Sequence, residues 1–196
     1  METQPSKSRK GTSSARIWAL TQSNREVVVR RFTIEDLPLF RDVRLRALED
    51  APDAFGSTLA GEIARTDDEW AERARKIVEE SVLALAITDE QAVGMAGGYR
   101  VPDRPDLADL WGMWVDPLYR GTDVARRLVG EVAEWASAIK ADAIELWVVE
   151  TNVRAVRFYE RFGFADTGHR QPMPRDPTLI EQRMEYPLKR SDSARS

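Results

Sequence analysis

A glycine-containing turn near the middle of the chain has the residue types that bind a phosphate group. The turn is Tyr119-Arg120-Gly121-Thr122-Asp123, and the amphipathic run that begins at Val124 predicts a helix directly after it. The first backbone N–H groups of a helix have no internal partner and lie at the positive end of its dipole, so an anion can accept their hydrogen bonds. Gly121 lets the backbone approach an anion closely because it has no Cβ atom. Arg120 could pair with phosphate through its planar fork of donors.

Two familiar phosphate-binding loops are excluded here, because the chain contains neither G-x-x-x-x-G-K-[ST] nor G-x-G-x-x-G at this place. The segment from Arg120 to Ala125 instead resembles the pyrophosphate loop of the GNAT superfamily of N-acetyltransferases, [R/Q]-x-x-G-x-[G/A], with Asp123 replacing the central glycine. The segment from Asn152 to Phe164 is similar to the N-x-x-A-x-x-F-Y-x-x-x-G-F block of the same superfamily. The resemblance is specific from about Asp109 to Phe164, and much less so from Val27 to Ile87.

The resemblance implies acetyl-CoA as the co-substrate and no metal. Backbone groups of the strand before the turn would bind the pantetheine arm as an added strand. The expected cofactor-binding residues are Met113, Trp114, Val115, Arg120, Gly121, Thr122, Asp123, Val124, Ala125 and Asn152. The carboxylate of Asp123 is unusual in such a loop, because two like charges about 4 Å apart repel by about 4 kcal/mol at an effective dielectric of about 20. Exposure of Asp123, or a neighbouring arginine, would remove much of this repulsion.

Two residues are candidates for the acetyl-transfer chemistry, which the resemblance implies to be direct attack by an amine in a ternary complex. Tyr159 stands where many members place the general acid that protonates the sulfur of coenzyme A, and a phenol with a pKa of about 10 is protonated at neutral pH. The alternative is a core aromatic beside Phe158 and Phe162. Asp109 stands where some members carry a general base. The alternative is an exposed residue at the end of a strand, with the base supplied instead by Asp106, Glu145 or Glu150.

The amine acceptor is expected to contact the loop 51–66, the helix from Thr66 and the proline-rich loop 171–177. The expected apolar contacts are Phe55, Trp70 and Trp111, and the side chains expected to attract an ammonium group are Glu62, Glu69 and Asp109. Because function follows the site rather than the fold, a small amine, an amine antibiotic, an amino acid and a protein N-terminus or lysine all remain open. The negative net charge of the chain favours a cationic small molecule. A non-catalytic acyl-CoA-binding regulatory domain is the alternative that Asp123 keeps open.

The apolar periodicity predicts an α/β domain in the order β-α-α-β-β-β-α-β-α-β-β. The expected strands are 27–32, 82–87, 92–101, 108–115, 143–149, one from Phe164 and 179–188, and the expected helices follow Thr33 and Thr66 and cover 124–139 and 153–161. This is also the order of the GNAT fold, in which the strands equivalent to 108–115 and 143–149 splay into a V. We therefore expect a mixed, mostly antiparallel sheet of six to seven strands flanked by about four helices.

The composition suits one globular domain over residues 26–188, between a flexible leader (1–25) and a flexible tail (189–196). Of 196 residues 42% are hydrophobic and 32% charged, and the net charge of −4 argues against a nucleic-acid partner. The absence of cysteine and the single histidine exclude disulfides, thiolate metal sites and a His-rich metal centre. No apolar run is long enough for a membrane span or a signal-peptide core, so we expect a cytoplasmic protein. The resemblance also makes a homodimer possible.

Overall fold

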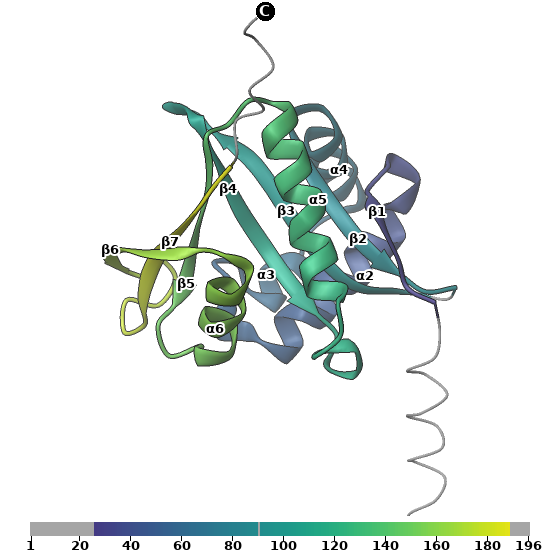
Figure 1. The fold of residues 1–196 in the computed structure, drawn as a ribbon. Coiled ribbons are helices and arrows are strands. Elements are labelled where there is room, and N and C mark those ends of the chain that lie inside the picture. Colours follow the sequence, from purple (N-terminus) through teal and green to yellow (C-terminus); the bar gives the residue numbers. More distant parts are fainter. Residues whose placement is uncertain (1–25, 90, 189–196) are drawn as a thin grey trace, which may run out of the picture.

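Seven strands pair into one sheet that helices cover on both faces (Figure 1). The computed structural model describes residues 26–89 and 91–188, so the predicted leader and tail lie outside the described residues. The strands are β1 (Val28–Arg31), β2 (Ser81–Ile87), β3 (Ala92–Val101), β4 (Arg104–Val115), β5 (Ala143–Val149), β6 (Ala165–Pro172) and β7 (Ile180–Pro187). The α-helices within the described part are α2 (Leu37–Asp50), α3 (Leu59–Ile63), α4 (Asp67–Glu80), α5 (Val124–Ala138) and α6 (Val153–Phe162).

The strand order in the sheet is β1-β2-β3-β4-β5-β7-β6. The pair β4–β5 is parallel, and the other neighbouring pairs are antiparallel. The predicted mixed, mostly antiparallel sheet is therefore confirmed. A parallel neighbour requires a crossover connection, and α5 is the helix of the crossover from β4 to β5.

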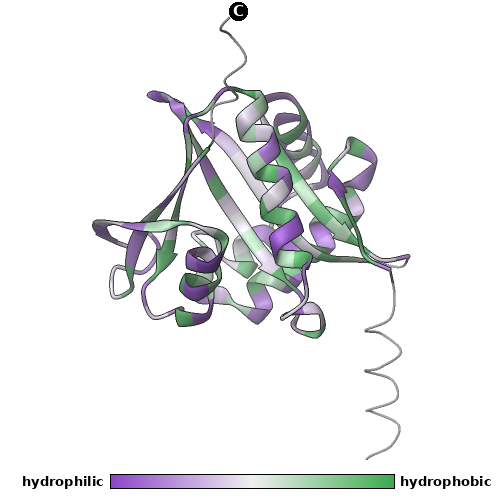
Figure 2. Ribbon diagram, viewed as in Figure 1, coloured by the Kyte–Doolittle hydropathy of each residue, from purple (hydrophilic) through white to green (hydrophobic). Residues whose placement is uncertain are grey.

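Helix α5 covers one face of the sheet, and α2 and α4 cover the other (Figure 1). Figure 2 shows α5 alternating between hydrophilic and hydrophobic residues along its length, as expected for a helix with one buried face. The glycines of β3 make this close packing possible. A Cβ atom at Gly98 would lie 2.7 Å from Val132 of α5, and one at Gly97 would lie 2.2 Å from the indole of Trp111.

Strands β4 and β5 pair only where Leu107–Asp109 meets Ala143–Glu145, and then separate. Further along, β4 contains a bulge, because three steps from Trp111 to Trp114 match two steps on β3. Gly112 lies in this bulge with a φ of +64°, which favours glycine. The predicted V between the two strands is thus confirmed, and the edge of β4 beyond Leu110 has no neighbouring strand on that side.

Two elements differ from the expectation. Strand β4 begins at Arg104 rather than at residue 108, because the hairpin from β3 continues into an exposed polar stretch without apolar alternation. The five-residue helix α3 lies inside the predicted loop 51–66 and is too short for a helical period to be detected. The predicted start of a helix after Thr66 is confirmed, and a capping box begins α4: Thr66 Oγ1 accepts from Glu69 N–H at 3.2 Å, and Glu69 Oε2 accepts from Thr66 N–H at 2.8 Å. Within the described residues, no helix has the length and apolar character of a membrane span.

Candidate active site

The V between β4 and β5 opens into two connected pockets. The turn pocket, about 360 Å³, lies between the end of β4, the turn 120–125 and α6. The inner pocket, about 450 Å³, lies between β4, β5, the segment 54–65 and α4. The two share the residues Ala54, Phe55, Met113, Asn152, Ala155 and Tyr159. A molecule bound in one pocket can therefore meet a molecule bound in the other at Tyr159.

The turn pocket places backbone next to open space. Gly121 has a φ of +82°, and Thr122 donates its hydroxyl proton to the carbonyl of Tyr119 at 2.7 Å, which closes the turn before α5. Gly121, Thr122 and Ala125 line the pocket, whereas Val124 is buried in the core. Asp123 is exposed, forms no side-chain capping bond and does not line the pocket. Because the Asp123 carboxylate lies outside the turn pocket, it is not placed to repel a pyrophosphate group bound there.

Arg120 holds the turn in place rather than extending freely into the pocket. Its Nε donates to the carbonyl of Val115 at 2.9 Å, and its Nη2 donates to Asp50 at the end of α2. Asp50 also accepts a hydrogen bond from Trp114 Nε1 at 2.9 Å. Burial would raise the pKa of Asp50, but the bonds from Trp114 and Arg120 outweigh it and lower that pKa. The guanidinium group of Arg120, which the sequence predicts to pair with phosphate, is thus partly occupied by hydrogen bonds within the protein.

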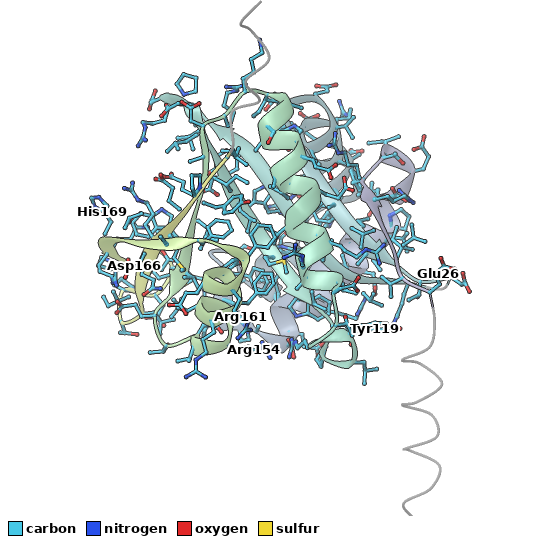
Figure 3. The ribbon with its side chains drawn as sticks, viewed as in Figure 1. Glu26, Tyr119, Arg154, Arg161, Asp166 and His169 are labelled. Atoms are coloured by element: carbon cyan, nitrogen blue, oxygen red, sulfur yellow. The ribbon has the colours of Figure 1, made fainter. Side chains whose placement is uncertain are left out.

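Two arginines that the sequence analysis did not single out also line the turn pocket. Arg154 and Arg161 project from α6 (Figure 3). They are seven residues apart, which places them on one face of a helix, and this spacing was the available signal. Arg157 lies between them in sequence, is exposed and does not line the pocket. The turn pocket is therefore lined both by the residues at the start of α5 and by two arginines of α6.

Tyr159 and Asn152 lie at the junction of the two pockets. The Tyr159 ring is 7% exposed and packs edge to face on Phe158 and Phe164, with centroid distances of 5.3 and 5.5 Å. Burial, and then the negative charge of Asp109, raise the pKa of Tyr159 further above its usual value, so the phenol holds its proton. Asn152 caps α6 by accepting from Ala155 N–H at 3.2 Å and also lines both pockets. Tyr159 thus packs against other aromatic rings and also lines the cleft, and Asn152 caps α6 and also lines the cleft.

Asp109 lies in the inner pocket, at the centre of a row of polar side chains across three strands. It is directly opposite Tyr99 on β3 and Glu145 on β5. Burial and the charge of Glu145 raise the pKa of Asp109 to about 7, although a hydrogen bond from Tyr99 acts in the opposite direction. Glu145 is 9% exposed, and its Oε2 lies 3.6 Å from Arg183 Nη1. A carboxyl group with a pKa near 7 can accept and release protons at neutral pH.

The other acidic candidates are placed differently. Asp106 is exposed on the outer part of β4, and Glu150 is exposed and paired with Arg170, so neither lines either pocket. Glu69 is engaged in capping α4. Glu62 lines the inner pocket but is not available to an ammonium group, because Arg65 and Arg73 bind both of its oxygens.

The three expected acceptor contacts separate into two groups. Phe55 and Trp111 line the inner pocket. Trp70 does not: it is 1% exposed and packs edge to face on Phe40 at 5.7 Å, on the buried side of α4. The prediction that Trp70 contacts the acceptor is therefore wrong, and Trp70 is a core residue. The capping box at Thr66 fixes where α4 begins, and with it the helical phase that turns this side chain inward. The loop 171–177 does reach this region, since Arg175 donates to the carbonyls of Phe55 and Pro52 at 3.1 and 2.9 Å.

His169 takes no part in the cleft. It is exposed on β6, at the outer edge of the sheet (Figure 3). Among the described residues, no group of three or more His, Asp or Glu side chains is placed to hold a metal ion. The titratable groups gathered in the cleft are thus carboxylates, tyrosines and arginines.

Comparison with known proteins identifies the same architecture. The acetyltransferase (GNAT) family model matches residues 45–164. An uncharacterized N-acetyltransferase of Methanocaldococcus jannaschii is 31% identical over 64 residues, which cover 33% of this chain and 28% of the relative. L-2,4-Diaminobutyric acid acetyltransferase of Vibrio parahaemolyticus is 26% identical over 78 residues, which cover 40% of this chain and 43% of that protein. The matches thus span less than half the length of either relative.

Solved structures match over a larger part of the chain. An acetyltransferase of the GNAT family from Streptococcus pneumoniae superposes with a TM-score of 0.70 at 20% identity, covering 84% of this chain and all of the other. A candidate acetyltransferase from Salmonella typhimurium, solved with its cofactor acetyl-CoA, gives 0.68 at 14% identity, covering 87% and 98%. At these identities the likeness shows the shared fold.

Proposed function

The chain belongs to the GNAT family of acetyltransferases, and on that premise we propose that it transfers the acetyl group of acetyl-CoA to a primary amine of a small molecule, by direct attack within a ternary complex. One observation carries the proposal: the turn pocket and the inner pocket meet at Tyr159, with Asp109 on the wall of the inner one. Two substrates can therefore approach from opposite sides of a shared point. This geometry suits direct transfer without a covalent intermediate on the protein.

The residues of the turn pocket fit coenzyme A. The edge of β4 from Met113 to Val115 lines this pocket and has no strand beside it on the side of β5, so its backbone can pair with the amides of a pantetheine arm. Gly121 and the start of α5 suit a pyrophosphate group, and Arg154 and Arg161 suit the remaining phosphate charge. The bound thioester would supply an activated acyl group.

The residues of the junction would manage the protons. Asp109, with a pKa of about 7, would take a proton from the attacking ammonium or amine, directly or through water. Tyr159 holds its proton because burial raises its pKa, and it would donate that proton to the departing sulfur. Near neutral pH the two groups would therefore differ in protonation, because Asp109 can exchange its proton and Tyr159 keeps its own.

Calorimetric titration with acetyl-CoA tests the first half of the proposal. Arg154→Ala and Arg161→Ala should each weaken binding by roughly 5- to 30-fold, the value of one charge-assisted contact at a partly exposed site. Arg157→Ala is the matched control on the same helix and should bind as the unchanged protein does. Equal affinity in all three variants would place the cofactor elsewhere.

Release of free thiol during incubation with a panel of amines tests the second half. The panel should include amines with and without a carboxylate, and among them L-2,4-diaminobutyric acid, which the name of the Vibrio relative suggests. Binding of acetyl-CoA without turnover of any amine would overturn the proposed transfer and favour an acyl-CoA-binding regulatory domain.

A further inference from the structure

Arg44 of α2 is a buried cation with unused donors that faces the inner pocket. Its side chain is 6% exposed, and only Nη2 has a good hydrogen bond, to Ser57 Oγ at 2.6 Å. Nε and Nη1 are buried without a hydrogen-bond partner in the described structure. Nη1 lies on the side of the β4 bulge, since a Cβ atom at Gly112 would be 3.7 Å from it. A buried donor without a hydrogen-bond partner destabilises the structure, so this arrangement suits a ligand that supplies the missing acceptor.

The neighbouring charges neutralise Arg44 only in part, because the one carboxylate that raises its pKa, Glu62, is shared with two other arginines. Glu62 is the nearby carboxylate, but its oxygens accept bonds from Arg65 Nε at 2.7 Å and Arg73 Nη1 at 2.8 Å, and Arg44 Nε is 3.5 Å away. Burial, and then the positive charge of Arg73, lower the pKa of Arg44 to about 10, so the guanidinium remains charged at neutral pH. Three guanidinium groups around one carboxylate leave this wall of the pocket with a surplus of positive charge. Figure 1 shows that α3, which carries Glu62, lies behind the gap between β4 and β5.

Another part of the wall of the inner pocket is acidic. Asp109 of β4 and Glu181 of β7 line it, and Glu145 lies beside Asp109. A ligand that carried only an ammonium group would satisfy this wall and leave Arg44 Nη1 without a hydrogen-bond partner. A ligand that carried only an anion would do the reverse. The pocket therefore matches a molecule with a positive and a negative end.

We propose that the acceptor is an amino acid or a closely similar zwitterion, whose amine is directed to Asp109 and whose carboxylate is bound by Arg44 Nη1 and the Ser57 hydroxyl. The proposal rests on the proposed acetyl transfer and names its acceptor class. Ser57 accepts the bond from Arg44, so its own proton remains free to donate to a second oxygen. Two adjacent donors suit the two oxygens of a carboxylate. The volume of about 450 Å³ suits a small molecule of this kind.

The test compares amino acids with the amines that remain when the carboxylate is removed: lysine with cadaverine, and ornithine with putrescine. The measured quantity is the ratio of kcat/KM for each amino acid to that for its decarboxylated partner. We expect the unchanged protein to prefer the amino acid, and Arg44→Met to reduce the ratio by roughly 10- to 100-fold, the value of a lost charge-assisted hydrogen bond. Ser57→Ala should reduce it in the same direction but less, and it keeps the test valid if Arg44→Met folds poorly. The matched control is Arg41→Met on the same helix, because Arg41 is outside the inner pocket and pairs with exposed Asp67.

Calorimetry of lysine and cadaverine with the protein saturated in coenzyme A gives a second readout that does not require turnover. Binding of lysine that Arg44→Met weakens, with Arg41→Met unchanged, supports the carboxylate site even if no amine is acetylated, in which case only the proposed transfer fails. Acetylation of both partners at equal rates, with a ratio that Arg44→Met does not change, overturns the zwitterion and leaves the transfer intact. A preference for phosphoethanolamine over the amino acids, lost in Arg44→Met, would assign the cationic wall to phosphate and overturn the carboxylate.

Discussion

The proposed acetyl transfer, with Asp109 as the proposed base, should follow the ionisation of Asp109 as the pH changes. Burial and the charge of Glu145 raise the pKa of Asp109 to about 7, so the carboxylate that accepts the proton is roughly one-tenth populated at pH 6 and nine-tenths populated at pH 8. The contribution of Asp109 to kcat/KM should therefore rise about tenfold between these two pH values and level off above them. Replacement of Asp109 by Asn should remove this rise together with most of the activity.

Two neighbours of Asp109 allow the assignment to be tested in opposite directions. The charge of Glu145 raises the pKa of Asp109, so Glu145→Gln should move the midpoint of the pH profile down. The hydrogen bond from Tyr99 lowers the same pKa, so Tyr99→Phe should move the midpoint up.

The assay is kcat/KM for one acceptor between pH 5.5 and 9, by thiol release under conditions where the acceptor is not saturating. Glu150→Gln is the control, since Glu150 is exposed, is paired with Arg170 and should not move the midpoint. The ionisation of the acceptor amine also raises the rate with pH, but substitutions in the protein do not change the pKa of the free amine. A midpoint that stays fixed in both Glu145→Gln and Tyr99→Phe would refute Asp109 as the base.

Three further outcomes are expected. Asp109→Asn should stabilise the protein at neutral pH. Because the pKa of Asp109 is raised to about 7 in the folded state, the folded state loses at most about 4 kcal/mol of stability as the pH rises from about 4 to about 7. In urea unfolding, the stability advantage of the variant should therefore be absent near pH 4 and complete above pH 7. Gly97→Ala should destabilise the fold by on the order of 1–3 kcal/mol and raise the acceptor KM, because the added Cβ lies 2.2 Å from the Trp111 indole. Gly130→Ala on α5 is its control, since nothing lies within 4 Å of the new Cβ, and it should gain about 0.5–1 kcal/mol; a loss in both variants would contradict the packing argument. Asp123→Gly should leave the affinity for acetyl-CoA within about twofold, because exposed charges are well screened; a large gain in titration calorimetry would return the carboxylate to the phosphate site.

The elements that build the turn pocket were predictable because each has a local signal. Helix α5 shows a continuous apolar face, and the capping residue Asn152 and the terminal Gly163 delimit α6. The helical phase of α6 also places Tyr159 on the buried side. These patterns extend over ten or more residues, so tertiary contacts reinforce them and do not override them.

The inner pocket was not predictable in the same way, because its residues come from elements distant in the sequence. Arg44, Glu62 and Arg73 lie on three different helices, and no spacing within the chain relates them. The tether from Arg120 to Asp50 spans seventy residues and similarly leaves no local pattern. Trp70 was wrongly predicted to contact the acceptor for a different reason. Its position in the sequence places it near the site, but the direction of its side chain depends on the phase of its helix.

The short seam between β4 and β5 has a consequence for how the molecule holds together. Strands β1–β4 form one hydrogen-bonded ladder and β5–β7 another, and only three residue pairs join them. A cofactor lying in the V would touch both ladders and would add hydrogen bonds where the sheet has none. At a concentration of one hundred times its Kd, a ligand of this kind adds about 2.7 kcal/mol to the stability of the folded state. That free energy would act mainly against separation of the two ladders, because the bound cofactor would lie between β4 and β5 as an added strand does. The amides of β5 should therefore exchange with solvent more slowly in the protein with bound cofactor than in the protein without it.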